Sequence, residues 1–293
     1  MLHHIDRKTT VLLVPENDAE AVQIIDLAKA LGMELLISAQ PHGARLEYED
    51  NLLERLQMTG KSDVVVVEMP GPEEEARLRK IGFNIMVIDH HRSDDGDRRT
   101  DPEPKEPLPS ALEQFLGAFD VTDEEIKTAG FDPRMVRGVG SMDRGFLWAL
   151  QRDGYSQDEI KDVSRYTRDL SRRARGDEKT DLNEAASARA WEHRRQAGEY
   201  LVVTSDEPGA EIRPVVSLMA AEQFGKPTPM IITSRGGLLI YVQETLKAIE
   251  LFKKFGGFTF GQDTCWGYNN AINERKVTIE NVLAVISKTS RML

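Results

Sequence analysis

Residues Asn84–His91 read NIMVIDHH, an apolar run that ends in an aspartate and two histidines. Such a run predicts a buried β-strand with the polar triplet at its carboxyl end. Upstream, Asp63–Val67 (DVVVV) carries four consecutive valines, which suits a central parallel strand buried on both faces. Two further expected strands, Thr10–Val14 (TVLLV) and Glu34–Ser38 (ELLIS), precede it. The N-terminal part is therefore expected to be α/β, a parallel sheet with helices on both faces.

Segments with helical periodicity connect these strands and make up most of the middle of the chain. The helices expected between the strands are Asp18–Leu31, Tyr48–Met58 and Glu73–Ile81, and those expected after them are Ser110–Phe119, Asp123–Ala129, Pro133–Ser141, Phe146–Arg152 and Ser156–Ser171. Leu170–Arg195 carries many charges and few large apolar residues, which indicates a helical linker. We therefore expect a first domain over residues 1–173, a linker over 174–198 and a smaller C-terminal α/β domain over 199–293.

Composition narrows the function classes. The 293 residues are 40% hydrophobic, which is enough for a buried core, and the 49 acidic against 38 basic side chains give a net charge of −11. This balance argues against a broad basic face that grips duplex nucleic acid. A single cysteine, Cys265, excludes an internal disulfide and a cysteine-rich zinc site. No signal peptide and no membrane span is recognisable, so a cytoplasmic protein without membrane attachment is expected.

Acidic and histidine side chains follow three of the four expected strands. They are Glu16, Asp18 and Glu20 after the first strand, Glu68 after the third, and Asp89, His90 and His91 after the fourth, with Asp143 after a later apolar turn. Because parallel strands end at one edge of their sheet, these carboxylates would repel one another there unless cations are bound. Oxygen ligands with one or two imidazoles suit a pair of Mn²⁺, Mg²⁺ or Zn²⁺ ions, which can clamp a phosphoryl group.

At these residues the chain resembles the DHH phosphoesterase superfamily, named for the Asp-His-His triplet seen here in VIDHH. The other motifs of the family align with ENDAEA (Glu16 at a histidine, Asp18 and Glu20 at two aspartates, Ala21 at a glycine), with VVVVEM at Glu68 and with GVGSMD at Asp143. Family members also carry a smaller C-terminal domain with a glycine-rich substrate loop, which FGGFTFG at Phe255–Gly261 is similar to. The resemblance spans most of the chain.

The resemblance implies a function and a set of roles. Two ions, Mn²⁺ or Mg²⁺, would be held by Glu16, Asp18, Glu20, Glu68, His90 and Asp143. Asp89 would orient His90, and His91 would contact the substrate phosphate. The implied reaction is the hydrolysis of a phosphoester in a nucleotide or short single-stranded oligonucleotide by metal-activated water, with the backbone amides of Gly256 and Gly257 against a phosphate or ribose. The oligomeric state stays open, with a homodimer as one option.

Two features of the second half have alternative interpretations. Arg235, in the Arg-Gly-Gly stretch between two expected strands, either presents its guanidinium to a phosphate or forms part of a hairpin turn. Trp266 and Tyr268, close to the glycine-rich loop, either stack a base or pack in the core.

Departures from the family motifs favour a second functional class. Glu16 replaces a neutral imidazole with an anion, Glu20 and Glu68 each add a methylene to the expected aspartate, and FGGFTFG lacks the histidine that the family places after its glycines. Small shifts of this kind are costly where positioning supplies the catalysis. The alternative function is therefore a catalytically weakened binding or scaffold protein linked to nucleic-acid metabolism.

Overall fold

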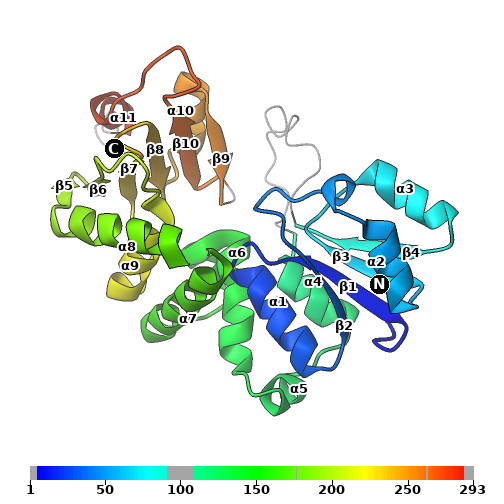
Figure 1. Ribbon diagram of the computed structural model, residues 1–293. Helices are drawn as coiled ribbons and strands as arrows, with labels where there is room; N and C mark the ends of the chain where they lie inside the picture. Colours follow the sequence, from blue (N-terminus) through cyan, green and yellow to red (C-terminus); the bar gives the residue numbers. More distant parts are fainter. Residues whose placement is uncertain (1–4, 91–107, 176, 262, 287–293) are drawn as a thin grey trace. The chain divides into compact units, whose positions relative to one another are not determined.

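The computed structural model describes residues 5–90, 108–175, 177–261 and 263–286, without the side chains of 175 and 177–180 (Figure 1). The chain divides into two compact units. The first comprises residues 1–144 and 169–175, and the second comprises residues 145–168 and 176–293. Within the described ranges, no helix is both long enough and apolar enough to cross a membrane.

The first unit alternates strands and helices in its N-terminal part and becomes helical after β4. Its elements are β1 (Thr10–Pro15), α1 (Ala19–Ala30), β2 (Glu34–Ser38), the 3₁₀ helix η1 (Leu46–Tyr48), α2 (Leu52–Thr59), β3 (Asp63–Val67), α3 (Pro72–Lys80), β4 (Asn84–Ile88), α4 (Ala111–Ala118), α5 (Asp123–Thr128) and the first part of α6 (Pro133–Arg152). The bounds of the four strands lie within one residue of the predicted bounds, so these four predicted strands are confirmed.

All strand pairs of the first sheet are parallel, in the order β2-β1-β3-β4. Val11 and Leu13 of β1 and Val64 and Val66 of β3 pack with the apolar side chains of α2 and α3 on one face. On the other face, α1 packs against β1 and β2, and α4 packs against β4 and α1. The predicted parallel sheet with helices on both faces is therefore correct. Helices cover both faces of its central strands, which explains why the sequence of these strands is apolar without interruption.

Two predicted helix boundaries differ from the structure. The helix predicted to begin at Tyr48 begins at Leu52, because Asn51 adopts a left-handed backbone conformation (φ 52°) that interrupts helical geometry. The helix predicted to end at Ser141 extends past that residue, and it meets the helix predicted from Phe146 at a kink within α6. Its backbone departs from helical angles at Gly145 and Phe146, and the division between the units falls just before that break.

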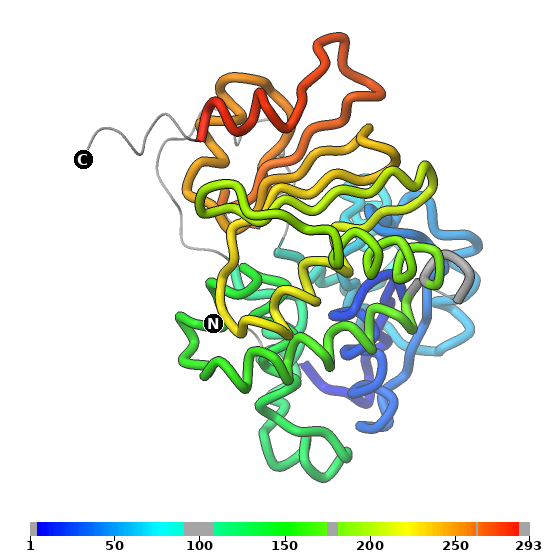
Figure 2. The backbone as a smooth tube through the Cα atoms, turned by 90° about the vertical axis from the view of Figure 1, so that its left-hand side faces the viewer, coloured from blue at the N-terminus to red at the C-terminus, as the bar shows by residue number. Residues whose placement is uncertain are grey.

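The second unit is built around a mixed sheet of six strands. Beyond the second part of α6, its elements are α7 (Gln157–Arg175, which belongs to this unit up to Arg168), α8 (Asp177–Glu192), β5 (Arg195–Ala197), β6 (Tyr200–Thr204), α9 (Arg213–Phe224), β7 (Met230–Ser234), β8 (Leu239–Gln243), α10 (Ala248–Phe255), β9 (Phe258–Phe260), β10 (Cys265–Asn269) and α11 (Ile279–Ile286). The strands lie side by side in the order β5-β6-β7-β8-β10-β9, and only β6 and β7 are parallel (Figure 2).

Two apolar clusters cover the two faces of this sheet. Trp266 and Tyr268 of β10 are buried together with side chains of α10 and α11 on one face. On the other face, Ala186, Ala190 and Trp191 of α8 are buried with side chains of α9. Residues 177–192, which the charge pattern assigned to a linker, thus form a helix that packs on the second sheet.

Candidate metal centre

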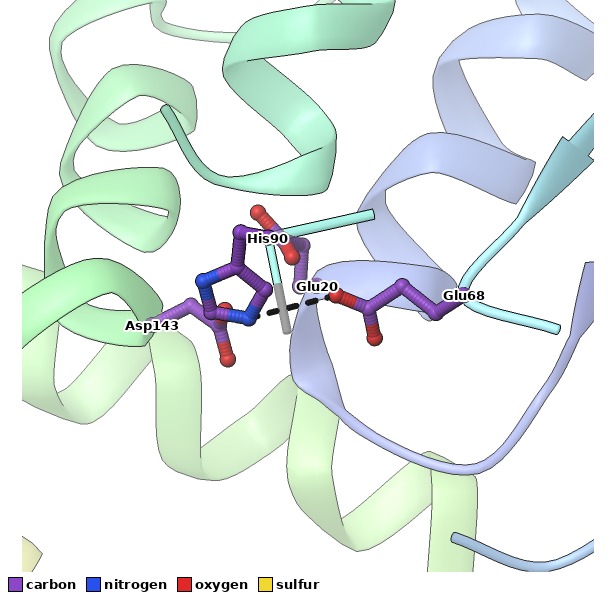
Figure 3. A group of neighbouring side chains, drawn as sticks. All are labelled: Glu20, Glu68, His90 and Asp143. Atoms are coloured by element: carbon purple, nitrogen blue, oxygen red, sulfur yellow. Dashed lines mark ion pairs between the residues drawn. The ribbon is translucent and has the colours of Figure 1, made fainter. Parts of the chain in front are cut away.

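Four side chains from four separate segments meet at the carboxyl edge of the first sheet. Glu20 lies in the first turn of α1, Glu68 directly follows β3, His90 follows β4 and Asp143 lies in α6. One ligand atom from each residue lies within 4.8 Å of every other, so the group could hold a metal ion (Figure 3). The parallel topology produces this meeting because β1, β3 and β4 all end at the same edge.

His90 contacts two of the carboxylates. Its Nε2 atom lies 2.8 Å from Oδ2 of Asp143 and 3.3 Å from Oε1 of Glu68. The side chains of Glu68 and His90 are 10% and 14% exposed, whereas that of Asp143 is 30% exposed. The cluster is therefore mostly shielded and opens to solvent beside Asp143.

Glu20 is anchored by the start of α4. The backbone N–H of Leu112 donates a hydrogen bond to Glu20 Oε1 at 2.9 Å, and the carboxylate also interacts with the Ser110 side chain. Within the described part of the chain, the other oxygen, Oε2, is buried and has no hydrogen-bond partner. A buried oxygen of this kind is costly when it stays unsatisfied, and a cation ligated by it would remove that cost.

Glu68 occupies a strained backbone position. Its φ of 48° lies in the left-handed region, which side-chain-bearing residues rarely adopt, and its N–H donates to Ile88 O at 3.0 Å. The neighbouring strand therefore fixes the turn immediately after β3. Strained residues that persist in this way cluster at functional sites, where the strain aims a side chain.

The cluster concentrates buried negative charge. Burial, followed by the charges of Asp143, Asp18 and Asp89, raises the pKa of Glu68 to about 10. Burial and then Asp143 also raise the pKa of Asp18, and the pKa of Glu20 lies well above its ordinary value for the same two leading reasons. Asp18, Glu20 and Glu68 thus resist ionisation in the absence of a counter-charge. This donor set fits a divalent cation, because a bound cation favours the ionised form of every carboxylate around it.

Asp143 is held in place by its neighbour in α6. Arg144 Nε lies 3.1 Å from Glu113 Oε2 of α4, and Glu113 also accepts a hydrogen bond from the Ser110 N–H in a capping box. At Gly140, one turn earlier, a Cβ atom would lie 2.7 Å from Ser110 Oγ. The helix that begins at Ser110 was predicted from the sequence, but its contribution to the metal centre was not.

The other predicted site residues of the first unit lie outside the four-residue group. Asp18 caps α1, because its Oδ1 accepts a hydrogen bond from the Ala21 N–H at 2.8 Å. Glu16 is exposed, and its N–H donates to Ser38 O. The Asp89 backbone oxygen accepts a hydrogen bond from the Gln114 side chain at 3.0 Å. His91 lies outside the described residues. The proposed roles of these four residues stay predictions.

The glycines of FGGFTFG serve packing within the second unit. The Trp266 indole donates to Gly256 O at 2.8 Å, and a Cβ on Gly257 would lie 2.3 Å from Gly267 O. Arg235 lies in the hairpin turn between β7 and β8, where its Nε is 3.6 Å from Glu211 Oε2. Trp266 is fully buried, which supports the core-packing interpretation over base stacking. A ligand-binding role for Gly256, Gly257 and Arg235 stays a prediction.

Comparisons with known proteins yield matches at the level of solved structures. No protein-family model matches the chain, and no curated protein matches it. The structure is similar to that of exonuclease RecJ bound to manganese, with 14% identity and a TM-score of 0.38 over 97% of this chain and 90% of that one. It is also similar to the pGpG-specific phosphodiesterase PggH from Vibrio cholerae, with 10% identity and a TM-score of 0.40 over 96% of this chain and 97% of that one.

Proposed function

We propose that this chain is a divalent-metal-dependent phosphoesterase of the DHH type, which hydrolyses a nucleotide or a short single-stranded oligonucleotide. The observation that carries the proposal is the meeting of Glu20, Glu68, His90 and Asp143 within 4.8 Å at the carboxyl edge of a parallel sheet. Three carboxylates and one imidazole match the oxygen-rich donor set that Mn²⁺ or Mg²⁺ prefers, and Mn²⁺ accepts the imidazole more readily.

The four residues would hold the metal, with Asp18 beside them and Glu16 further along the same loop. A bound divalent cation would neutralise phosphoryl oxygens and lower the pKa of a water molecule. Asp143 would supply a carboxylate on the open side of the cluster, where substrate enters, because it is the most exposed of the four. Glu20 and the Leu112 N–H would keep the buried side rigid, since the Glu20 carboxylate is tied to the backbone of α4.

The test combines metal binding with turnover, and it compares two aspartate variants. Titration calorimetry of the parent is expected to show stoichiometric Mn²⁺ binding, and Asp143→Asn is expected to weaken it at least tenfold. Asp123→Asn serves as the matched control, because Asp123 pairs with Arg137 on the surface of the same unit. Nucleotides, short oligonucleotides, cyclic dinucleotides and pyrophosphate are then assayed for Mn²⁺-dependent release of product. Absence of both binding and turnover in the parent contradicts the proposal.

One observation favours the alternative function, a binding or scaffold protein. Glu16, which stands where the resembled family has a histidine, is exposed and lies outside the four-residue group. A centre with fewer ligands would bind metal without supporting efficient turnover. Tight Mn²⁺ binding combined with complete inertness toward every phosphoester would select this alternative.

A further inference from the structure

One side chain in the first turn of α4 reaches the strand end that carries His90. The side-chain amide of Gln114 donates hydrogen bonds to two backbone carbonyl oxygens, Asp89 O at 3.0 Å and Pro109 O at 2.8 Å. An amide group has two N–H donors, so each carbonyl can take one of them. Gln114 therefore links the chain just after β4 to the chain just before α4, through bonds that involve no charged group.

The carbonyl that Gln114 binds after β4 belongs to the peptide unit that joins Asp89 to His90. A peptide unit is planar, so the Asp89 oxygen and the backbone N and Cα atoms of His90 lie in one rigid group. A hydrogen bond to that oxygen therefore restrains the orientation of the whole group. Gln114 thus acts on the point from which the His90 imidazole projects.

The ladder between β3 and β4 ends just before this peptide unit. Its last register pair is Val67 with Ile88, and the Glu68 N–H donates to Ile88 O at 3.0 Å. The next carbonyl oxygen along the chain, that of Asp89, accepts from Gln114. Successive carbonyls are thus held from two sides, first by the chain at the end of β3 and then by α4.

The placement of His90 matters because its imidazole lies between two carboxylates (Figure 3). Its Nε2 atom is 2.8 Å from Asp143 Oδ2 and 3.3 Å from Glu68 Oε1. Groups that orient a metal-ligating histidine strongly affect the metal affinity of a site, because the ligand atoms must stay at fixed separations. A shift of the His90 backbone would move the imidazole away from carboxylates that come from other segments.

A glutamine suits this place better than a charged side chain. An ionised glutamate would offer the two carbonyls another acceptor instead of a donor, and it would add negative charge beside the carboxylates. A lysine or an arginine could donate, but its charge would compete with a cation for the same carboxylates. The neutral amide donates to both carbonyls without either effect.

We propose that Gln114 is a positioning residue of the metal centre, which holds the Asp89–His90 peptide so that the imidazole stays among the carboxylates. Gln114 lies outside the group of four and acts through the backbone of its neighbours rather than as a ligand. The role of His90 as a ligand rests on the proposed function, whereas the hold on its backbone does not require a bound metal ion.

Two variants of the full-length protein remove the contact by different means. Gln114→Met keeps the length of the side chain without its donors, and Gln114→Asn keeps the amide on a stem one methylene shorter. Both are expected to weaken Mn²⁺ binding about tenfold in calorimetric titration, the lower end of the loss that is typical when a group orienting a ligating histidine is removed. Asn84→Ala is the matched control, because the Asn84 amide donates to Asp63 Oδ1 at 2.8 Å at the opposite ends of β3 and β4. This control is expected to bind Mn²⁺ within twofold of the parent.

A spectroscopic signature separates positioning from a general loss of stability. Pulsed electron paramagnetic resonance of bound Mn²⁺ detects the nitrogen of a directly coordinated imidazole. At saturating Mn²⁺ the nitrogen signal is expected in the parent and in Asn84→Ala, is expected to be absent from His90→Gln, and is expected to be weaker in both Gln114 variants. Circular dichroism confirms that all variants are folded. Parent-like Mn²⁺ affinity together with an unchanged nitrogen signal in both Gln114 variants would overturn the proposal.

A measurement in EDTA distinguishes this proposal from the proposed function. Nuclear magnetic resonance of the protein with ¹³C-labelled histidine reports on the His90 imidazole, whose signal is assigned by its loss in His90→Gln. Both Gln114 variants are expected to shift or broaden that signal, and Asn84→Ala is expected to leave it unchanged. If the parent binds no Mn²⁺ while the His90 signal responds to Gln114, the metal centre is overturned and the hold on His90 stands. If the His90 signal does not respond, the hold on His90 is overturned, whether or not Mn²⁺ binds.

Discussion

Each carboxylate of the metal centre is restrained by a different device. Glu20 is tied to the Leu112 N–H, Glu68 is aimed by a left-handed backbone, and Asp143 stands next to the Arg144–Glu113 ion pair. Glu20 and the neighbour of Asp143 are both held by the first turn of α4, and Glu68 is held by its own backbone, so the side chains stay close together although their charges repel. Burial, and after it this repulsion, raises the pKa of Glu20 and of Glu68, and a bound cation would favour their ionised forms.

Another buried carboxyl, Glu244 at the end of β8 in the second unit, predicts a pH dependence of stability. It is 2% exposed, and burial raises its pKa to about 8, although a hydrogen bond from the Leu147 backbone acts in the opposite direction. The folded state therefore keeps a proton that the unfolded chain loses above about pH 4.5. Stability is expected to fall as pH rises from about 4.5 to about 8, by up to about 1.4 kcal/mol per pH unit.

The measurement is urea denaturation in EDTA across that pH range. Glu244→Gln is expected to reduce the slope, because the amide cannot release a proton, while Glu20 and Glu68 continue to contribute. Glu250→Gln, at an exposed position in α10, is the control and should keep the slope of the parent. An identical slope in Glu244→Gln and the parent would show that Glu244 is not the group responsible.

At the scale of elements, α4 connects helix capping to the metal centre. Ser110 caps α4 through a capping box with Glu113, and the same turn supplies the Leu112 N–H to Glu20. The first unit contains a second capping box, Thr122 with Glu125, at the start of α5. The two boxes make equivalent local bonds, but only the first contacts a residue of the metal centre.

Removing each cap should therefore separate stability from metal binding. Ser110→Ala and Thr122→Ala are each expected to destabilise the protein by about 1 kcal/mol, the usual cost of losing such a cap. Only Ser110→Ala is expected to weaken Mn²⁺ binding. The expected loss of affinity is roughly tenfold, which corresponds to about 1.4 kcal/mol of binding free energy. Urea denaturation and calorimetric titration measure the two effects. Equal Mn²⁺ affinity in the two variants would contradict the link through Glu20.

At the scale of the whole molecule, the metal centre belongs to one of the two units. All four of its residues lie in the first unit. A ligand that binds only the folded form stabilises the part that holds it, by about 2.7 kcal/mol at one hundred times its dissociation constant. Bound Mn²⁺ should therefore protect the first unit before the second.

Hydrogen exchange followed by mass spectrometry tests this division. Mn²⁺ is expected to slow exchange in β1, β3 and β4 and to leave exchange in β9 and β10 unchanged. Asp143→Asn should remove the Mn²⁺ effect. Protection of the second unit alone by Mn²⁺ would contradict the placement of the metal centre.

The strands of the first unit and the residues that follow them could be predicted from local sequence. The valine run Asp63–Val67 and the apolar run Asn84–Ile88 are strands in the structure because a strand covered on both faces needs apolar side chains at every position. Since parallel strands end at one edge, the prediction that Glu68 and His90 lie together followed directly, and the structure brings them within 3.3 Å.

Only the tertiary structure decided which polar residues meet. Asp18 and Glu20 are two residues apart, yet Asp18 caps α1 while Glu20 turns into the cluster, because α4 offers a backbone N–H to Glu20. Tyr241 and Phe258 are distant in sequence and become neighbours through their common partner Gly267. Local sequence patterns indicate which side chains of one element are buried. The contacts described here depend instead on how separate elements pair and pack. The sequence therefore determined the strands and the acidic residues that follow them, and the fold determined which of those residues meet.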